Sequence, residues 1–172
     1  MQNYFELFDL ETSFFIDDDQ LKTSYRKEIS RFHPDKYVTK SESEKIQALQ
    51  NTSLLNTAFT SLKTPLNRAS YLLKIEGLDP FDERDTAMNH DFLISQIDLR
   101  EELEVIEADR DSLGLEDFLE RVDLHIEENT ESIYKGFKLK NDLMDIKMNV
   151  RELKFYDQLY NCLLYTSDAA DE

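Results

Sequence analysis

The sequence has 172 residues, enough for one compact domain or two small ones. Hydrophobic residues make up 40% of it and charged residues 33%, a balance that permits a buried core and argues against wholesale disorder. Only three glycines and three prolines occur, whereas average usage would give roughly twenty of the two together. Because sheets joined by tight turns need those residues, the composition favours helices.

The formal net charge of −17 is concentrated in the second half of the chain. Residues 1–76 carry 10 Lys and Arg against 11 Asp and Glu, whereas residues 77–161 carry 10 against 23. An acidic half repels phosphates, which excludes nucleic acid as its partner. No apolar run approaches the roughly 20 residues of a membrane span, and the N-terminal residues resemble no export or organelle signal. With a single cysteine, which suits a reducing compartment, these features predict a cytoplasmic protein without a membrane partner.

The first half of the chain predicts a short helical turn and three helices. The turn covers residues 4–10, and the acidic run at residues 17–19 offers an N-cap for a helix over residues 20–32. A capping-box pattern begins a second long helix over residues 41–63, and a third apolar helix covers residues 66–75. Two long helices joined by a short loop should pack antiparallel. Their expected apolar positions are Leu21, Tyr25, Ile29 and Phe32, and then Ile46, Leu49, Leu55, Ala58, Phe59 and Leu62.

The second half predicts three further helices, over residues 91–111, 115–137 and 139–161. Gly114 and Gly136 lie at the two joints, where C-terminal cap glycines are common, so we expect them to end the first two of these helices. Three helices of this length would form a bundle about 30 Å long. The apolar positions of its first helix are Phe92, Leu93, Ile97, Leu103 and Ile106.

The tripeptide His33-Pro34-Asp35 lies in the loop between the two long helices of the first half. Proline fixes the local backbone and removes a hydrogen-bond donor, so it stiffens this loop. We therefore expect the His33 and Asp35 side chains to be free to bind a partner instead of closing a local turn.

The helices on either side of the tripeptide carry further motifs. The preceding helix contains Tyr25-Arg26-Lys27, and the following helix contains Leu55-Asn56-Thr57-Ala58-Phe59. With the tripeptide, these motifs resemble the J domain of partners of DnaK-type chaperones. The resemblance implies that the tripeptide contacts the ATPase chaperone and stimulates ATP hydrolysis. Basic residues nearby either steer association with a negative partner surface or form an ordinary solvated face. The predicted chaperone-binding residues are His33, Pro34, Asp35, Lys22, Arg26, Lys27 and Lys36.

Later motifs narrow the family. The runs from Pro65 to Leu73, from Leu99 to Leu103 and from Val150 to Phe155 resemble the HscB co-chaperones of iron–sulfur cluster assembly. The resemblance implies an all-α, L-shaped arrangement of a J domain over residues 1–75 and a three-helix scaffold-binding domain over residues 76–161. It also implies that the chain delivers the scaffold protein IscU to the DnaK-type chaperone HscA, stimulates the ATPase activity of HscA, and promotes cluster transfer and maturation of iron–sulfur proteins.

The same resemblance implies a scaffold-binding patch in the second half. Its residues are Leu93, Ile94, Ile97, Asp98, Glu101 and Phe155. Spacing supports part of this patch, because every fourth residue of a helix shares a face, and apolar residues flanked by acids suit a protein-binding surface. The alternative is that the apolar members fill the bundle core, as helical stripes usually do. Val105 departs from the family, which often has an acid there, and this puts the footprint of the patch in doubt.

Other functions are weakly supported by the sequence. His33 and Asp35 could form an acid–base pair, but no third group, phosphate-binding loop or nucleophile motif accompanies them. The three histidines are isolated and no cysteine pair has ligand spacing, so we predict no enzyme, metal or cofactor. A J-domain protein with a different client stays open, and so does an acidic structural bundle in which the tripeptide is accidental.

The end of the chain, Cys162–Glu172, resembles one reading frame of a transposase-type sequencing adapter. We therefore expect residues 162–172 to be an artefact that replaces the native C-terminus. The alternative is a frayed acidic end.

Overall fold

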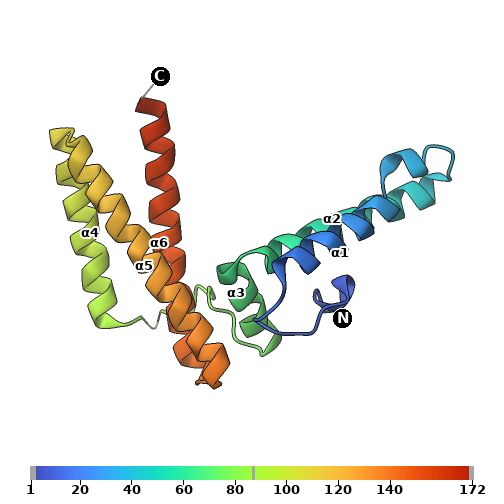
Figure 1. Cartoon of the computed structure of the whole chain (residues 1–172), viewed down its shortest axis with the longest axis horizontal. Helices are drawn as coiled ribbons and strands as arrows, with labels where there is room; N and C mark the ends of the chain where they lie inside the picture. The colour runs from blue at the N-terminus through green and yellow to red at the C-terminus, as the bar shows by residue number, and fades with distance from the viewer. Residues whose placement is uncertain (1–2, 87, 171–172) are drawn as a thin grey trace. The chain divides into compact units, whose positions relative to one another are not determined.

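A computed structural model describes residues 3–86 and 88–170 of the chain, with the side chains of Pro34, a predicted chaperone-binding residue, and of residues 164–170 outside the description. Within these residues every element is helical, which confirms the predicted all-α class. The chain divides into two compact units, Met1–Glu76 and Gly77–Glu172. The elements, shown in Figure 1, are η1 (Glu6–Phe8), α1 (Asp18–Arg31), η2 (Pro34–Lys36), α2 (Glu42–Lys63), α3 (Pro65–Ile75), α4 (His90–Asp109), α5 (Ser112–Leu139) and α6 (Leu143–Ala170).

The first unit is built on the antiparallel pair α1 and α2, which lie side by side in Figure 1. Both helices begin within two residues of the predicted positions, at caps that the sequence offers. The Asp17 side chain accepts hydrogen bonds from the backbone N–H groups of residues 19 and 20, and Ser41 and Glu44 form a complete capping box. Helix α3 begins directly at Pro65, because proline fits the first helical position. The core of the unit consists of Phe5, Phe8, Leu10, Leu21, Leu55, Ala58 and Leu62.

A buried arginine holds the corner of the first unit together. Arg68 on α3 donates from Nε to the carbonyl of Leu62 at 2.9 Å and from Nη1 to the carbonyl of Phe14 at 3.1 Å. Its Nη2 donates to Asp18 Oδ1 at 2.6 Å. The side chain thereby joins the end of α2 to the segment before α1 and to the first turn of α1, which fixes the start of the helix that leads to the His33 corner.

The prediction that Ile46 and Leu49 lie on the apolar face of α2 is wrong, because both side chains are largely exposed. The buried stripe of α2 runs through Ala48 and Leu55 toward Leu62. Residues on a helix are separated by about 100°, so Leu49 points well away from the stripe that contains Ala48.

The second unit is a bundle of α4, α5 and α6, in which α5 and α6 make the longest contact. Its core includes Phe92, Leu99, Phe118, Val122, Tyr156 and Leu163. Gly136 on α5 lies close to α6: a Cβ atom placed on it would be 2.8 Å from Ile146 Cγ1. Glycine fits here because any side chain would force Ile146 or the helices to shift.

The two glycines predicted to end helices do not do so. Gly114 lies in the first turn of α5, where its N–H donates to Asp111 Oδ1 at 3.0 Å, and Gly136 lies inside the same helix. Helices α4 and α5 end instead at Arg110 and Lys140, with left-handed φ angles of 52° and 54°. The closing hydrogen bonds come from the backbone N–H groups of the two cap residues and of the residues that follow them, and these bonds offset the cost of a left-handed non-glycine residue.

Helix α6 continues past residue 161 to Ala170, and the Leu163 side chain is buried in the core. Residues 171 and 172, the last of the predicted artefact, lie outside the described residues. The origin of residues 162–172 stays a prediction from the sequence.

Candidate functional site

The loop between α1 and α2 exposes the His33 and Asp35 side chains, with 56% and 87% of their surfaces accessible. Contrary to the prediction, the two residues also close a local turn. The Asp35 N–H donates to His33 Nδ1 at 3.4 Å, and Lys36 N–H donates to the His33 carbonyl at 2.9 Å within the short helix η2. His33 Nδ1 also lies 3.5 Å from Asp35 Oδ2, so the imidazole and the carboxylate of the corner face each other. The corner therefore holds the imidazole in a defined orientation while leaving it accessible.

Exposed basic residues lie on α1, which leads to this corner, and in η2, which follows His33. Lys22, Arg26 and Lys27 are exposed on α1, and Lys36 is exposed in η2. Lys22 has a partner, Asp19, at 3.7 Å. Among the residues that the structure describes, Arg26, Lys27 and Lys36 form no ion pair. Exposed cations without a partner attract an acidic surface over a distance of about 8–10 Å at moderate ionic strength.

Helix α4 carries the predicted patch on its exposed surface. Leu93, Ile94 and Ile97 are all exposed, so the alternative that they fill the core does not hold. Positions Leu93 and Ile97, which were expected on the apolar face, are exposed because Phe92 and Leu99 point into the bundle in their place. Asp98 and Glu101 are exposed along the same two turns.

Phe155 joins this patch from α6. It is partly buried, and its ring packs edge-on against Phe92 at 5.6 Å and against Tyr156 at 5.3 Å between centroids. Since Phe92 immediately precedes Leu93, this contact places Phe155 beside the N-terminal end of the patch. Burial raises the pKa of the Tyr156 phenol, so its hydroxyl stays protonated and the aromatic cluster stays neutral.

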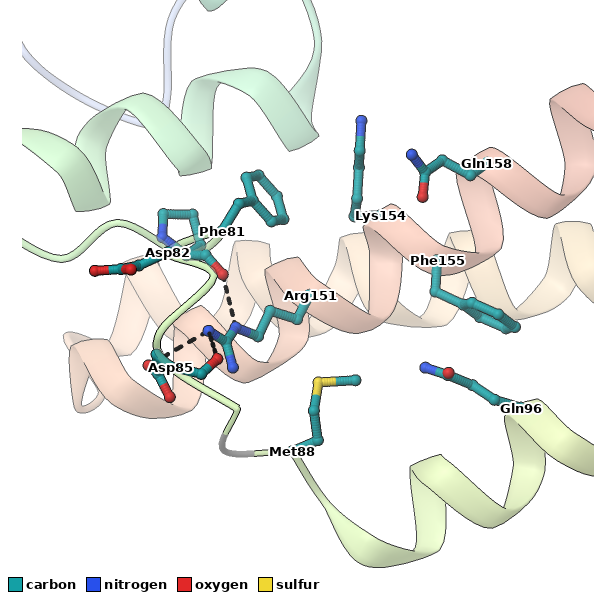
Figure 2. A pocket seen from close by; sticks show the side chains of 10 residues that line it. Phe81, Asp82, Asp85, Met88, Gln96, Arg151, Lys154, Phe155 and Gln158 are labelled. Atoms are coloured by element: carbon teal, nitrogen blue, oxygen red, sulfur yellow. Dashed lines mark hydrogen bonds and ion pairs between the residues drawn. The ribbon is translucent and has the colours of Figure 1, made fainter.

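Sequence reasoning missed a buried ionic cluster on the same helix. Arg151 donates from Nε to the Pro80 carbonyl at 2.6 Å and from Nη2 to the Asp85 carbonyl at 2.8 Å, as Figure 2 shows. Asp85 Oδ2 also pairs with Arg151 at 3.3 Å and with Lys147. Lys and Arg on a helix usually lie on its exposed side, so the sequence pattern did not indicate that Lys147 and Arg151 are buried. The one sequence signal near them was the resemblance of the run from Val150 to Phe155 to the HscB family.

Among residues 3–86 and 88–170, no three His, Cys, Asp or Glu side chains are grouped so that they could hold a metal ion. No helix in the described part of the chain has the length and apolarity to cross a membrane.

Comparison with known proteins decides the family. The family model described as the HSCB C-terminal oligomerisation domain matches residues 88–163. A co-chaperone protein HscB homolog of Neisseria meningitidis is 37% identical over 164 residues, which is 94% of this chain and 96% of the relative. The chain belongs to the HscB family. HscB proteins are co-chaperones, a class that assists a chaperone and is not itself enzymatic, and the family serves iron–sulfur cluster assembly.

Solved structures agree with membership of the HscB family. Chaperone HscB from Vibrio cholerae has a TM-score of 0.84 and 32% identity, and the match covers 98% of this chain and 99% of that one. The human co-chaperone HscB has a TM-score of 0.88 at 24% identity, covering 97% of this chain and 83% of that one. The human structure supports the fold alone.

Proposed function

We propose that this chain binds the scaffold protein IscU on the α4 patch and delivers it to the DnaK-type chaperone HscA, whose ATPase activity it stimulates. The His33 corner and the surrounding cations are the proposed contact with HscA. Cluster transfer to maturing iron–sulfur proteins would follow from that delivery. The proposal places both partners in the cytoplasm, as the sequence predicts.

The observation that carries the proposal is the exposure of His33 and Asp35, together with exposed Arg26, Lys27 and Lys36, which form no ion pair among the residues that the structure describes. A buried corner could not reach another protein. The exposed imidazole of His33 can hydrogen-bond a group on HscA, and the Asp35 carboxylate can accept from a donor. Arg26 and Lys27 would attract an acidic face of the chaperone and accelerate the encounter, so stimulation should weaken as salt is added. ATP hydrolysis itself belongs to the chaperone.

The client surface is supported by its exposure and chemistry. Leu93, Ile94 and Ile97 are apolar, exposed and contiguous on α4, and nothing in the bundle uses their outer surfaces. Apolar side chains at the centre of an interface supply most of its affinity, while charged residues at the rim fix the relative orientation of the two partners. Asp98 and Glu101 would therefore pair with basic groups of IscU around an apolar centre.

The test replaces His33 with glutamine. His33→Gln should abolish stimulation of the HscA ATPase while IscU affinity and the unfolding midpoint stay unchanged, because the side chain is exposed and its lost contacts are local. His90→Gln is the matched control, since His90 is also exposed but lies in the other unit, and it should stimulate HscA normally in the absence of IscU. Full stimulation by His33→Gln would contradict the proposed role of the corner.

A further inference from the structure

A cavity of about 310 Å³ lies between the segment that precedes α4 and one side of α6. Its apolar lining comes from Phe81, Met88 and Phe155 (Figure 2). Gln96 on α4, with Lys154 and Gln158 on α6, adds polar groups around this lining. Small-molecule pockets run from about 300 to 1,000 Å³ and enclose most of their ligand. This cavity is at the lower end of that range and opens broadly to solvent, so it suits a side chain that projects from a larger partner.

The floor of the cavity is fixed before any partner binds. Arg151 is 92% buried, and its guanidinium holds the carbonyls of Pro80 and Asp85, while Lys147 holds the Asp85 carboxylate. Breaking such a buried pair is costly, so the segment cannot collapse into the cavity at low cost. Binding to a preformed cavity costs less entropy, because the cavity does not have to become ordered when the partner binds. Because these charges are paired with each other, they do not offer a site for an anion.

The cavity is continuous with the proposed client surface. Phe155 lines the cavity and is also a member of the patch. Gln96 lies three residues after Leu93 on α4, a spacing that puts the two side chains on neighbouring positions of one helix face. Lys154 is partly engaged already, since its Nζ lies 5.9 Å from the centroid of the Phe81 ring.

We propose that this cavity is a side-chain subsite of the client surface and takes one bulky apolar side chain of IscU, an inference that rests on the proposed function. The apolar side chain would lie against Phe81, Met88 and Phe155. The amides of Gln96 and Gln158 would hydrogen-bond the peptide groups that flank it. The subsite thereby extends the footprint from the exposed face of α4 onto α6 and selects clients that carry an apolar anchor at the matching position.

The first experiment fills the cavity. Gln158→Trp places an indole at its edge and should weaken IscU binding about tenfold or more, because a blocked hot spot loses its anchor. Gln50→Trp is the matched control, since Gln50 is exposed on α2 in the other unit, and it should leave the affinity unchanged. Ile97→Ala, measured in parallel, tests the client surface itself.

The second experiment reports on the cavity directly. The chain has no tryptophan, so Phe81→Trp introduces a single reporter at a partly exposed aromatic position. Its emission, taken as the difference from the wild-type complex, should shift to shorter wavelength when IscU binds. The Phe81→Trp emission tests the subsite even if the Gln158→Trp variant does not fold. An unshifted emission in a formed complex would overturn the subsite.

The outcomes separate the two proposals. If Ile97→Ala weakens binding while Gln158→Trp binds normally, the subsite is wrong and the proposed function stands. If neither variant weakens binding, both proposals fail. If Gln158→Trp changes only the self-association of the chain in the absence of IscU, the occupant is a second copy and the subsite for IscU is also overturned.

Discussion

Truncating two half-exposed residues of α4 should weaken client binding while the chain stays folded. Leu93 and Ile97 have 42% and 57% of their surfaces exposed, and the buried parts of α4 are supplied by Phe92 and Leu99. The double variant Leu93→Ala, Ile97→Ala therefore removes apolar surface that the partner would cover and leaves the bundle core in place.

The size of the effect follows from the exposed fractions. Complete burial of a leucine or isoleucine side chain contributes about 1.5–3 kcal/mol. Since roughly half of each side chain remains to be buried by a partner, each contributes about 1 kcal/mol, and the pair about 2 kcal/mol. This corresponds to about a thirtyfold increase in the Kd for IscU.

Calorimetric titration of the full chain with IscU measures this change. The control is Leu124→Ala, Leu139→Ala, because these α5 residues are 52% and 69% exposed and lie outside the patch. The control should bind like the wild type, and both double variants should stay folded with Tm lowered by no more than about 8 °C, because the buried parts of the truncated side chains contribute about 2 kcal/mol to folding. Equal affinities for the two double variants would refute the assignment of the patch.

Three further predictions concern the fold that presents these surfaces. Arg68→Met should lower the free energy of unfolding by about 2–4 kcal/mol in urea titrations, because two buried backbone carbonyls lose their donor; an unchanged midpoint would show that the corner does not depend on this side chain. Gly136→Ala should cost about 1–3 kcal/mol, measured by thermal unfolding, because its Cβ would lie 2.8 Å from Ile146 Cγ1, and a stabilised variant would contradict the close approach. Hydrogen bonds from the backbone N–H and hydroxyl of Ser41 lower the pKa of Glu44, so the stability that this group adds is complete above the ordinary glutamate pKa of about 4.3 and is lost as the pH falls through the lowered value. Glu44→Gln should therefore make unfolding less sensitive to acid, and an identical pH profile would argue against a capping role.

Local signals in the sequence predicted where several helices begin. The caps at Asp17 and Ser41 depend on residues within one turn, so the sequence contains all of the information that they need. The ends of α4 and α5 could not be predicted in this way. Arg110 and Lys140 adopt left-handed conformations that are stabilised by the hydrogen bonds around the turn rather than by their own preference, and Gly136 is required by a neighbouring helix.

The candidate surfaces show a second limit of sequence reasoning. Periodicity groups Leu93 and Ile97 with other apolar residues, but it does not say which side of a helix faces the core. Likewise, the buried ammonium group of Lys147 pairs with Asp85, which lies 62 residues away in the sequence, so local patterns could not predict this contact. The family resemblance, which the comparisons confirm, supplied the residues of the patch, and the structure supplied their exposure and the cavity beside Phe155.

The ATPase rate of HscA with this chain, with IscU and with both together tests the central claim most directly. The chain alone should raise the rate through its His33 corner. With both present, the rate should exceed the sum of the separate effects, because a client held on α4 reaches the chaperone at a high effective concentration. A rate with both proteins no higher than the rate with IscU alone would contradict the account.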